Sequence, residues 1–128
     1  MRGYYALIQY CPEPSRAEGA NVGVVLYCPE AKFLDVQMSL DNDHARRLFT
    51  GATFDSERLS AAKSAFANRL KQVGQEFRSV EDLEQFMRTR GNALQLVPPR
   101  PVRVDEPAAS LKQLFAELVG GRSRADAH

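Results

Sequence analysis

The segment best suited to chemistry is residues 16–27, RAEGANVGVVLY, in which Arg16, Glu18 and Asn21 come just before an apolar run. If that run is a strand, the three polar side chains gather at one end of a sheet, where they could form a recognition site. The alternative is structural, because Asn and Glu side chains also cap neighbouring backbone groups. Gly23, inside the run, predicts either a β-bulge or a close approach by another backbone.

Basic residues elsewhere in the chain suggest two further surfaces. Segment 88–103 is rich in arginines that could converge on an anion, since a guanidinium group binds anions in a bidentate manner: Arg88, Arg90, Arg100 and Arg103. We group Arg100 with Arg16, Glu18 and Asn21 as candidate binding residues. The basic residues of the central part of the chain alternate with polar ones and predict a solvated helix face: Arg58, Lys63, Arg69 and Lys71.

The sequence contains no recognisable motif for binding a metal or a cofactor. The chain has two His and two Cys, and no pair of them has the spacing of a zinc site. The phosphate-binding pattern G-x-x-x-x-G-K-[ST] does not occur. The sequence therefore predicts no metal and no cofactor. It does not decide whether the protein is an enzyme, but it favours a protein without enzymatic activity.

Three apolar or alternating segments predict strands that form an antiparallel meander: residues 4–11, 21–28 and 33–40. Cys11 and Cys28 then lie at opposite ends of the first hairpin, farther apart than the roughly 7 Å between Cα atoms that a disulfide allows. Both cysteines are predicted to be free and buried. Short strands are also predicted at 93–97 and 102–104, with PPRP between them.

Helical periodicity begins in the middle of the chain. A short helix is predicted near 41–49 and a long one over 56–77, with Gly74 as a weak point near its end. Ser79 and Asp82 have the spacing of a capping box at the start of a third helix. Pro107, behind Asp105 as the candidate cap, starts the last helix.

These elements predict a single α+β domain over residues 1–121, with an antiparallel sheet of about 4–5 strands and three or four helices packed on one face. Residues 122–128 are predicted to be a flexible polar tail. The net charge of +1, from 17 basic and 16 acidic residues, argues against a general nucleic-acid or membrane-surface binder. Apolar runs too short to cross a bilayer, and a start without a signal-peptide pattern, predict a cytoplasmic protein.

Three stretches, in this order, resemble a known family: YYALIQYCPEP from residue 4, R-x-E-x-x-N-x-G-V-V-L from residue 16, and LVPPRPV…DEP…LKQLFAELV from residue 96. The chain is similar to the bacterial domain-of-unknown-function family 3037, and Ala20 departs from the bulky apolar residue that the family often has there. The resemblance brings no established activity. It implies a small cytoplasmic protein whose gene lies beside those of HipA-type kinases, and hence a protein partner.

Three functional hypotheses remain open at this point. The favoured one is a protein-interaction or regulatory module, with a HipA-type kinase as the partner that the resemblance implies. The second is an enzyme or nucleic-acid-processing factor that uses Arg16, Glu18 and Asn21 together with Arg100. The third, which the balanced charge does not favour, is a nucleic-acid binder through residues 88–103.

Overall fold

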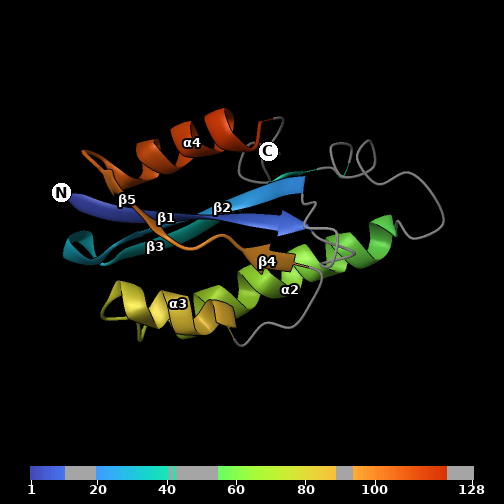
Figure 1. The fold of residues 1–128 in the computed structure, drawn as a ribbon, viewed down its shortest axis with the longest axis horizontal. Coiled ribbons are helices and arrows are strands. Elements are labelled where there is room, and N and C mark those ends of the chain that lie inside the picture. The colour runs from blue at the N-terminus through green and yellow to red at the C-terminus, as the bar shows by residue number, and fades with distance from the viewer. Residues whose placement is uncertain (11–19, 41, 43–54, 89–93, 121–128) are drawn as a thin grey trace.

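The computed structural model describes residues 1–10, 20–40, 42, 55–88 and 94–120. These residues form an antiparallel sheet flanked by helices (Figure 1). The predicted short helix near 41–49 and the predicted polar tail lie almost wholly outside the described residues. The elements are β1 (Arg2–Tyr10), β2 (Ala20–Cys28), the 3₁₀ turn η2 (Pro29–Ala31), β3 (Phe33–Met38), α2 (Ser56–Gly74), α3 (Val80–Arg88), β4 (Leu94–Leu96), β5 (Arg100–Arg103) and α4 (Pro107–Leu118).

The first two strands are antiparallel neighbours, as the sequence predicts. Tyr4 is opposite Tyr27 at one end of the pair, and Tyr10 is opposite Ala20 at the other. β2 also pairs with β3 in antiparallel orientation, and β4 and β5 both pair with the far side of β1. The polar connection 11–19 therefore joins two strand ends that lie side by side.

β4 and β5 are two pieces of one edge strand, separated by a bulge. β4 ends opposite Ile8 and β5 begins opposite Tyr5, so residues 97–99 face only two residues of β1. The two prolines in this segment explain the interruption, because proline cannot donate a hydrogen bond to a sheet. The extra residue also reverses the side that later side chains face. Leu96 packs on one face of the sheet, whereas Val102 packs on the other.

Helices cover both faces of the sheet, with α2 and α3 on one side and α4 on the other (Figure 1). The α+β class and the antiparallel sheet are as predicted, but the packing of every helix on one face is not. β2 shows the physical reason. Val25 and Tyr27 belong to the core with α2 and α3, while Leu26 and Cys28 belong to the core with α4. A strand that is apolar on both faces needs cover on both.

Polar caps and a close contact define the ends of the helices. Asp55 caps α2, because its carboxylate accepts a hydrogen bond of 3.0 Å from a backbone N–H in the first turn. The Asp82 carboxylate accepts one of 3.2 Å from the backbone N–H of Ser79, which is the acceptor half of the predicted capping box. α2 ends at Gly74, where a Cβ would collide with Leu34 of β3. The glycine thus allows α2 and β3 to approach closely.

α4 is capped by Glu106 and not by the predicted Asp105, and Pro107 occupies its first turn. The Glu106 carboxylate accepts a hydrogen bond of 2.7 Å from the Ala109 N–H. Replacing Glu106 with Ala should lower the free energy of unfolding by about 1 kcal/mol, the usual effect of losing an N-cap. Urea unfolding measures this change. Asp105→Ala is the matched control and should leave the midpoint unchanged; equal losses in both variants would contradict the assignment of the cap.

Candidate functional site

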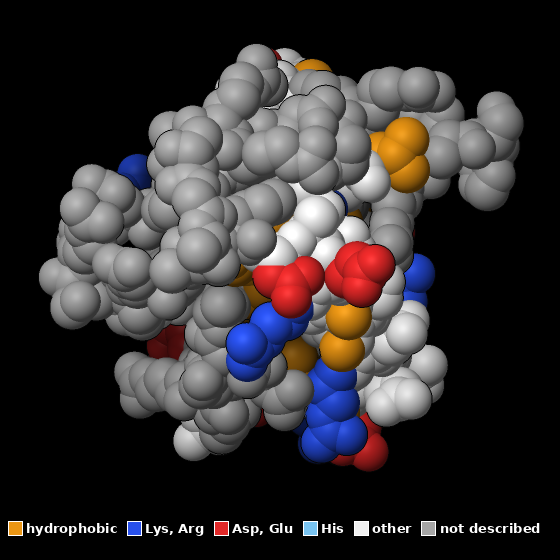
Figure 2. Space-filling model, turned by 90° about the vertical axis from the view of Figure 1, so that its right-hand side faces the viewer, with side chains coloured by type: hydrophobic (Ala, Val, Ile, Leu, Met, Phe, Trp, Pro, Cys, Tyr) orange, Lys and Arg blue, Asp and Glu red, His pale blue; other side chains and the backbone are white. Residues whose placement is uncertain are grey.

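One end of the sheet, where β1 ends and β2 and β4 begin, carries a set of polar groups; we call it the loop end. Tyr10 pairs there with Ala20 on one side and with Leu94 on the other. α2 begins at the same end (Figure 1), and Figure 2 looks onto it, with acidic and basic side chains close together on this face. Arg16 and Glu18 lie in the connection 11–19, outside the described residues.

Asn21 is the predicted site residue that the structure places most clearly. Its Nδ2 donates a hydrogen bond of 3.0 Å to the backbone oxygen of Leu118, at the C-terminal end of α4. Its Oδ1 accepts one of 2.9 Å from the side-chain amide of Gln9 on β1. The side chain therefore joins β1, β2 and α4. This is backbone capping, as the structural alternative expected, but the capped group is distant in the sequence.

Gly23 lies beside a β-bulge and also at a close approach by another strand, the two alternatives that the sequence suggested. The pairing of β1 with β2 shifts by one residue between Ile8 and Gln9, so β2 bulges just before Gly23. A Cβ on Gly23 would also lie 2.5 Å from the Met38 sulfur and 3.0 Å from the backbone oxygen of Gln37. The glycine is needed because β3 passes so close to the bulge.

Removing the Asn21 side chain should loosen α4 more than the sheet. Asn21→Ala leaves a helix carbonyl and the Gln9 amide without their partners, and two half-buried hydrogen bonds of this kind contribute about 1–2 kcal/mol. We expect that loss in urea unfolding, together with faster amide hydrogen exchange in the last turn of α4. The control is Gln95→Ala, an exposed residue of β4. An unchanged exchange rate in α4 would show that Asn21 does not hold the helix.

Arg100 is not brought together with Asn21. It lies on β5 opposite Tyr5, whereas Asn21 lies on β2 opposite Gln9, on the other side of β1. Four residues of extended strand alone separate these two pairing positions by about 13 Å. The side chain of Arg100 is exposed. Within the described residues, the proposed grouping of Arg100 with Asn21 therefore has no common site.

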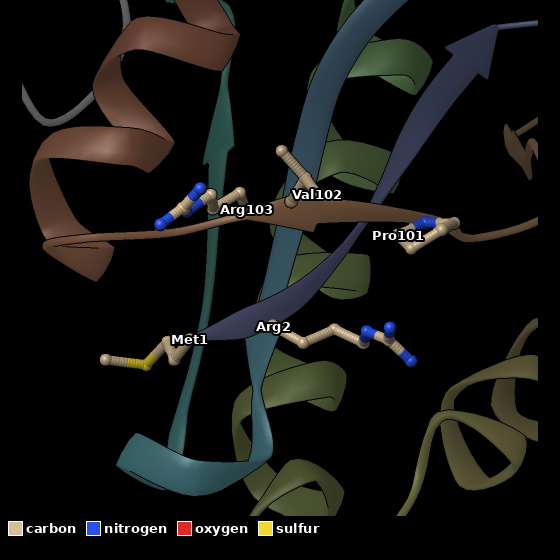
Figure 3. A pocket seen from close by; sticks show the side chains of 5 residues that line it. All are labelled: Met1, Arg2, Pro101, Val102 and Arg103. Carbon is tan, nitrogen blue, oxygen red and sulfur yellow. The ribbon is translucent and has the colours of Figure 1, made fainter.

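Two arginines, Arg2 and Arg103, border a shallow pocket at the end of the sheet opposite the loop end. The pocket has a volume of about 390 Å³ and is lined by Met1, Arg2, Pro101, Val102 and Arg103. Arg2 and Arg103 are directly opposite one another on β1 and β5. In Figure 3 their guanidinium groups point in opposite directions. The two side chains therefore do not clamp a single anion in this arrangement.

Lys63 of α2 is buried, which corrects its assignment to a solvated helix face. It is only 1% exposed, and its Nζ donates hydrogen bonds of 2.9 Å to the backbone oxygen and 3.2 Å to the hydroxyl of Ser39, just after β3. The sequence does contain the signal. Lys63 follows Leu59 by four residues and precedes Phe66 by three, so it falls on the apolar stripe of the helix.

Asn42 extends this buried contact toward the start of α2. Its Nδ2 donates to the backbone oxygen and hydroxyl of Ser56 and to the hydroxyl of Ser60, at 2.9–3.0 Å. The Ser56 carbonyl fixes the orientation of the amide, because a carbonyl can only accept. Among the described residues, Asn42 Oδ1 is the one buried side-chain oxygen or nitrogen without a hydrogen bond. Together with Ser39 and Lys63, these residues form what we call the polar network.

The polar network and Tyr10 have features of structural residues and not of a reaction centre. At 1% exposure the Lys63 amine has no surface for a substrate, and its hydrogen bonds to Ser39 tie the end of β3 to α2. Burial raises the pKa of the Tyr10 hydroxyl; the charge of Arg58 opposes this shift and that of Asp55 adds to it. Tyr10 is therefore neutral at physiological pH, so no phenolate is available as a base.

Other reactive groups in the described part of the chain are buried or scattered. No three His, Cys, Asp or Glu side chains there lie close enough to hold a metal ion. Cys28 is a free, buried thiol, as predicted, and burial raises its pKa. Cys11 lies outside the described residues. No helix of the described residues is both long and apolar enough to cross a membrane.

A comparison with known protein families identifies the chain by its class. Residues 5–119 match the family described as "Protein of unknown function (DUF3037)". The chain belongs to this family, as the order of its sequence stretches suggested. No curated protein and no solved structure matches the chain.

Proposed function

We propose that this chain is a cytoplasmic protein-interaction module without catalytic activity of its own, and that its partner is a kinase of the HipA type. Two observations support an interaction module. Asn21 and the polar network are engaged in contacts that hold the fold together. A groove lies elsewhere, along an edge of the sheet that no other described strand covers. The kinase as partner rests on the family resemblance.

The observation that carries the proposal is a groove between β3 and α2, which we call the edge groove. Its volume is about 350 Å³, and its walls are Asp35, Val36, Gln37 and Met38 on β3, and Ser64, Ala67, Asn68 and Lys71 on α2. The four helix residues recur at intervals of three, one and three, so they form one face of α2. This face is separate from the apolar stripe that packs in the core. Such a groove suits a protein ligand.

β3 supplies an open strand edge to this groove. It pairs with β2 on one side, and among the described residues no strand pairs with its other side. Ser39 N–H donates to Val22 of β2, so by the two-residue period the N–H groups of Leu34, Val36 and Met38 point away from β2. An open edge of this kind is where proteins add a strand from a partner.

The enzyme alternative draws less support from the described residues. It requires Asn21 to be available to a substrate, but both polar atoms of that amide have internal partners. It also requires Arg100 at the same site, and β1 separates the two. A Glu18→Gln variant tests this alternative, since loss of a cellular phenotype at unchanged stability would favour it.

Co-expression with a HipA-type kinase, the partner that the family resemblance implies, tests the proposed function. We expect the two proteins to co-purify and to bind in calorimetry with a Kd in the micromolar range or tighter, as is usual for specific interfaces. The kinase alone and the chain with an unrelated kinase are the controls. A well-folded chain that shows no heat of binding at high micromolar concentration would overturn the proposal.

A further inference from the structure

We propose that the edge groove takes up an extended segment of the partner, which adds to β3 as a new strand and sets a carboxylate against Lys71. This inference rests on the proposed function and names how the partner is recognised. The groove offers three things to such a segment: a length, a set of backbone groups and a charge.

The length follows from two contacts that bracket the groove. Near one end, Gly74 of α2 packs against Leu34 of β3, and near the other, Lys63 binds Ser39. From Lys63 to Gly74 a helix advances about 16 Å at about 1.5 Å per residue. From Leu34 to Ser39 a strand advances the same distance, about 16 Å. α2 therefore runs beside β3 in the opposite direction, and the groove between them admits about five residues of extended chain.

The outward backbone groups of β3 could pair with a new strand, although one of them already has a side-chain partner. Asp35 Oδ1 accepts a hydrogen bond of 2.8 Å from the outward N–H of Val36. A carboxylate placed this way protects the edge from indiscriminate pairing, since it occupies the amide and presents a charge. A specific partner strand would take over the Val36 N–H and release the carboxylate. The outward N–H of Met38, which has no partner among the described residues, would gain one at the same time.

The helix wall defines the side chains that fit. Ser64 and Ala67 are small, so a large apolar side chain of the incoming strand can lie over them. Lys71 is exposed and forms no ion pair within the described residues, although it lies on the same groove as Asp35. A carboxylate between these walls gains Lys71 as a partner, whereas a second cation would be repelled by it. The segment is therefore extended, with an apolar residue near a Glu or Asp.

Hydrogen exchange of the kinase complex tests the strand addition directly. We expect the amides of Val36 and Met38 to exchange at least about tenfold more slowly in the complex than in the free chain, because new ladder bonds protect them. If the complex forms and these amides exchange as in the free chain, the inference is wrong while the proposed function stands. If no complex forms, both are overturned. Protection that grows with concentration in the chain alone would identify a second copy as the occupant and would also overturn it.

Two variants of α2 add a matched test of the same groove. Ala67→Trp fills the groove and Ala65→Trp places the same side chain on an exposed position of the same helix. We expect the first to weaken kinase binding at least tenfold and the second to leave it unchanged. Lys71→Glu should weaken binding and abolish its decrease with added salt, since it replaces the charge attraction with a repulsion that salt screens. Equal binding by the two tryptophan variants, with both folded, would contradict the inference.

Discussion

Lys63→Ala should be among the most destabilising single substitutions in this chain, lowering the free energy of unfolding by about 3–5 kcal/mol. Two effects add. The long side chain is fully buried, so its removal leaves a cavity beneath the end of β3. The backbone oxygen and hydroxyl of Ser39 also lose their hydrogen-bond donor. Urea unfolding followed by circular dichroism measures the loss.

Lys71→Ala is the control for this prediction. It removes the same kind of side chain from the same helix two turns later, where the lysine is exposed. Its expected effect is within about 0.5 kcal/mol, as for most surface substitutions. If the two alanine variants were equally stable, Lys63 would not be the buried anchor described above.

Gly23→Ala should destabilise the sheet by about 2–3 kcal/mol, the upper part of the range of about 1–3 kcal/mol for overpacking a tight core. The new methyl group would meet the Met38 sulfur, the backbone oxygen of Gln37 and the end of Ile8 at 2.5, 3.0 and 3.2 Å. The sulfur can move, but the carbonyl belongs to the paired strand β3 and cannot yield without disturbing the ladder. Thermal or urea unfolding gives the change in stability.

A double variant separates this collision from the general effect of adding a methyl group. Met38→Ala creates space beside Gly23. The double variant that combines Gly23→Ala with Met38→Ala should therefore lose less free energy of unfolding than the sum of the two single losses, by about 1 kcal/mol. Strictly additive losses would mean that Met38 and Gly23 do not share the space, and that β3 does not approach the bulge as described.

Local patterns in the sequence predicted the parts of the fold that depend on near neighbours. The antiparallel hairpin of β1 and β2 follows from two apolar runs around a short polar connection. Asp82 and Pro107 lie at helix starts because their effects act within one turn. Gly74 ends α2 as its weak helix propensity suggested. Each of these features requires only a few adjacent residues to specify it.

The features that the sequence did not predict depend on contacts between distant residues. Asn21 binds Leu118, and no local pattern links these two positions. The face on which Val102 lies depends on the bulge at 97–99, since one inserted residue reverses it. Lys63 was misassigned because its type outweighed its position on the apolar stripe. Periodicity alone would have placed it in the core.

The edge groove could not be predicted from the sequence for the same reason. The sequence pointed to Arg16, Glu18 and Asn21 because polar residues beside a glycine are conspicuous in a linear chain. The edge groove has no such signal, since its walls come from β3 and α2 and its helix face is made of Ser64, Ala67, Asn68 and Lys71. Small and polar residues on a helix look like ordinary solvent-facing positions until a strand edge lies beside them.

One binding titration sets the two candidate sites against each other. The HipA-type kinase is titrated, in parallel calorimetry experiments, with the wild-type chain, with Ala67→Trp and with Glu18→Gln. An edge-groove module predicts that Ala67→Trp loses binding while Glu18→Gln keeps the wild-type Kd. The reverse result, in which Glu18→Gln loses binding and Ala67→Trp keeps the wild-type Kd, would place recognition at the loop end and contradict binding in the edge groove.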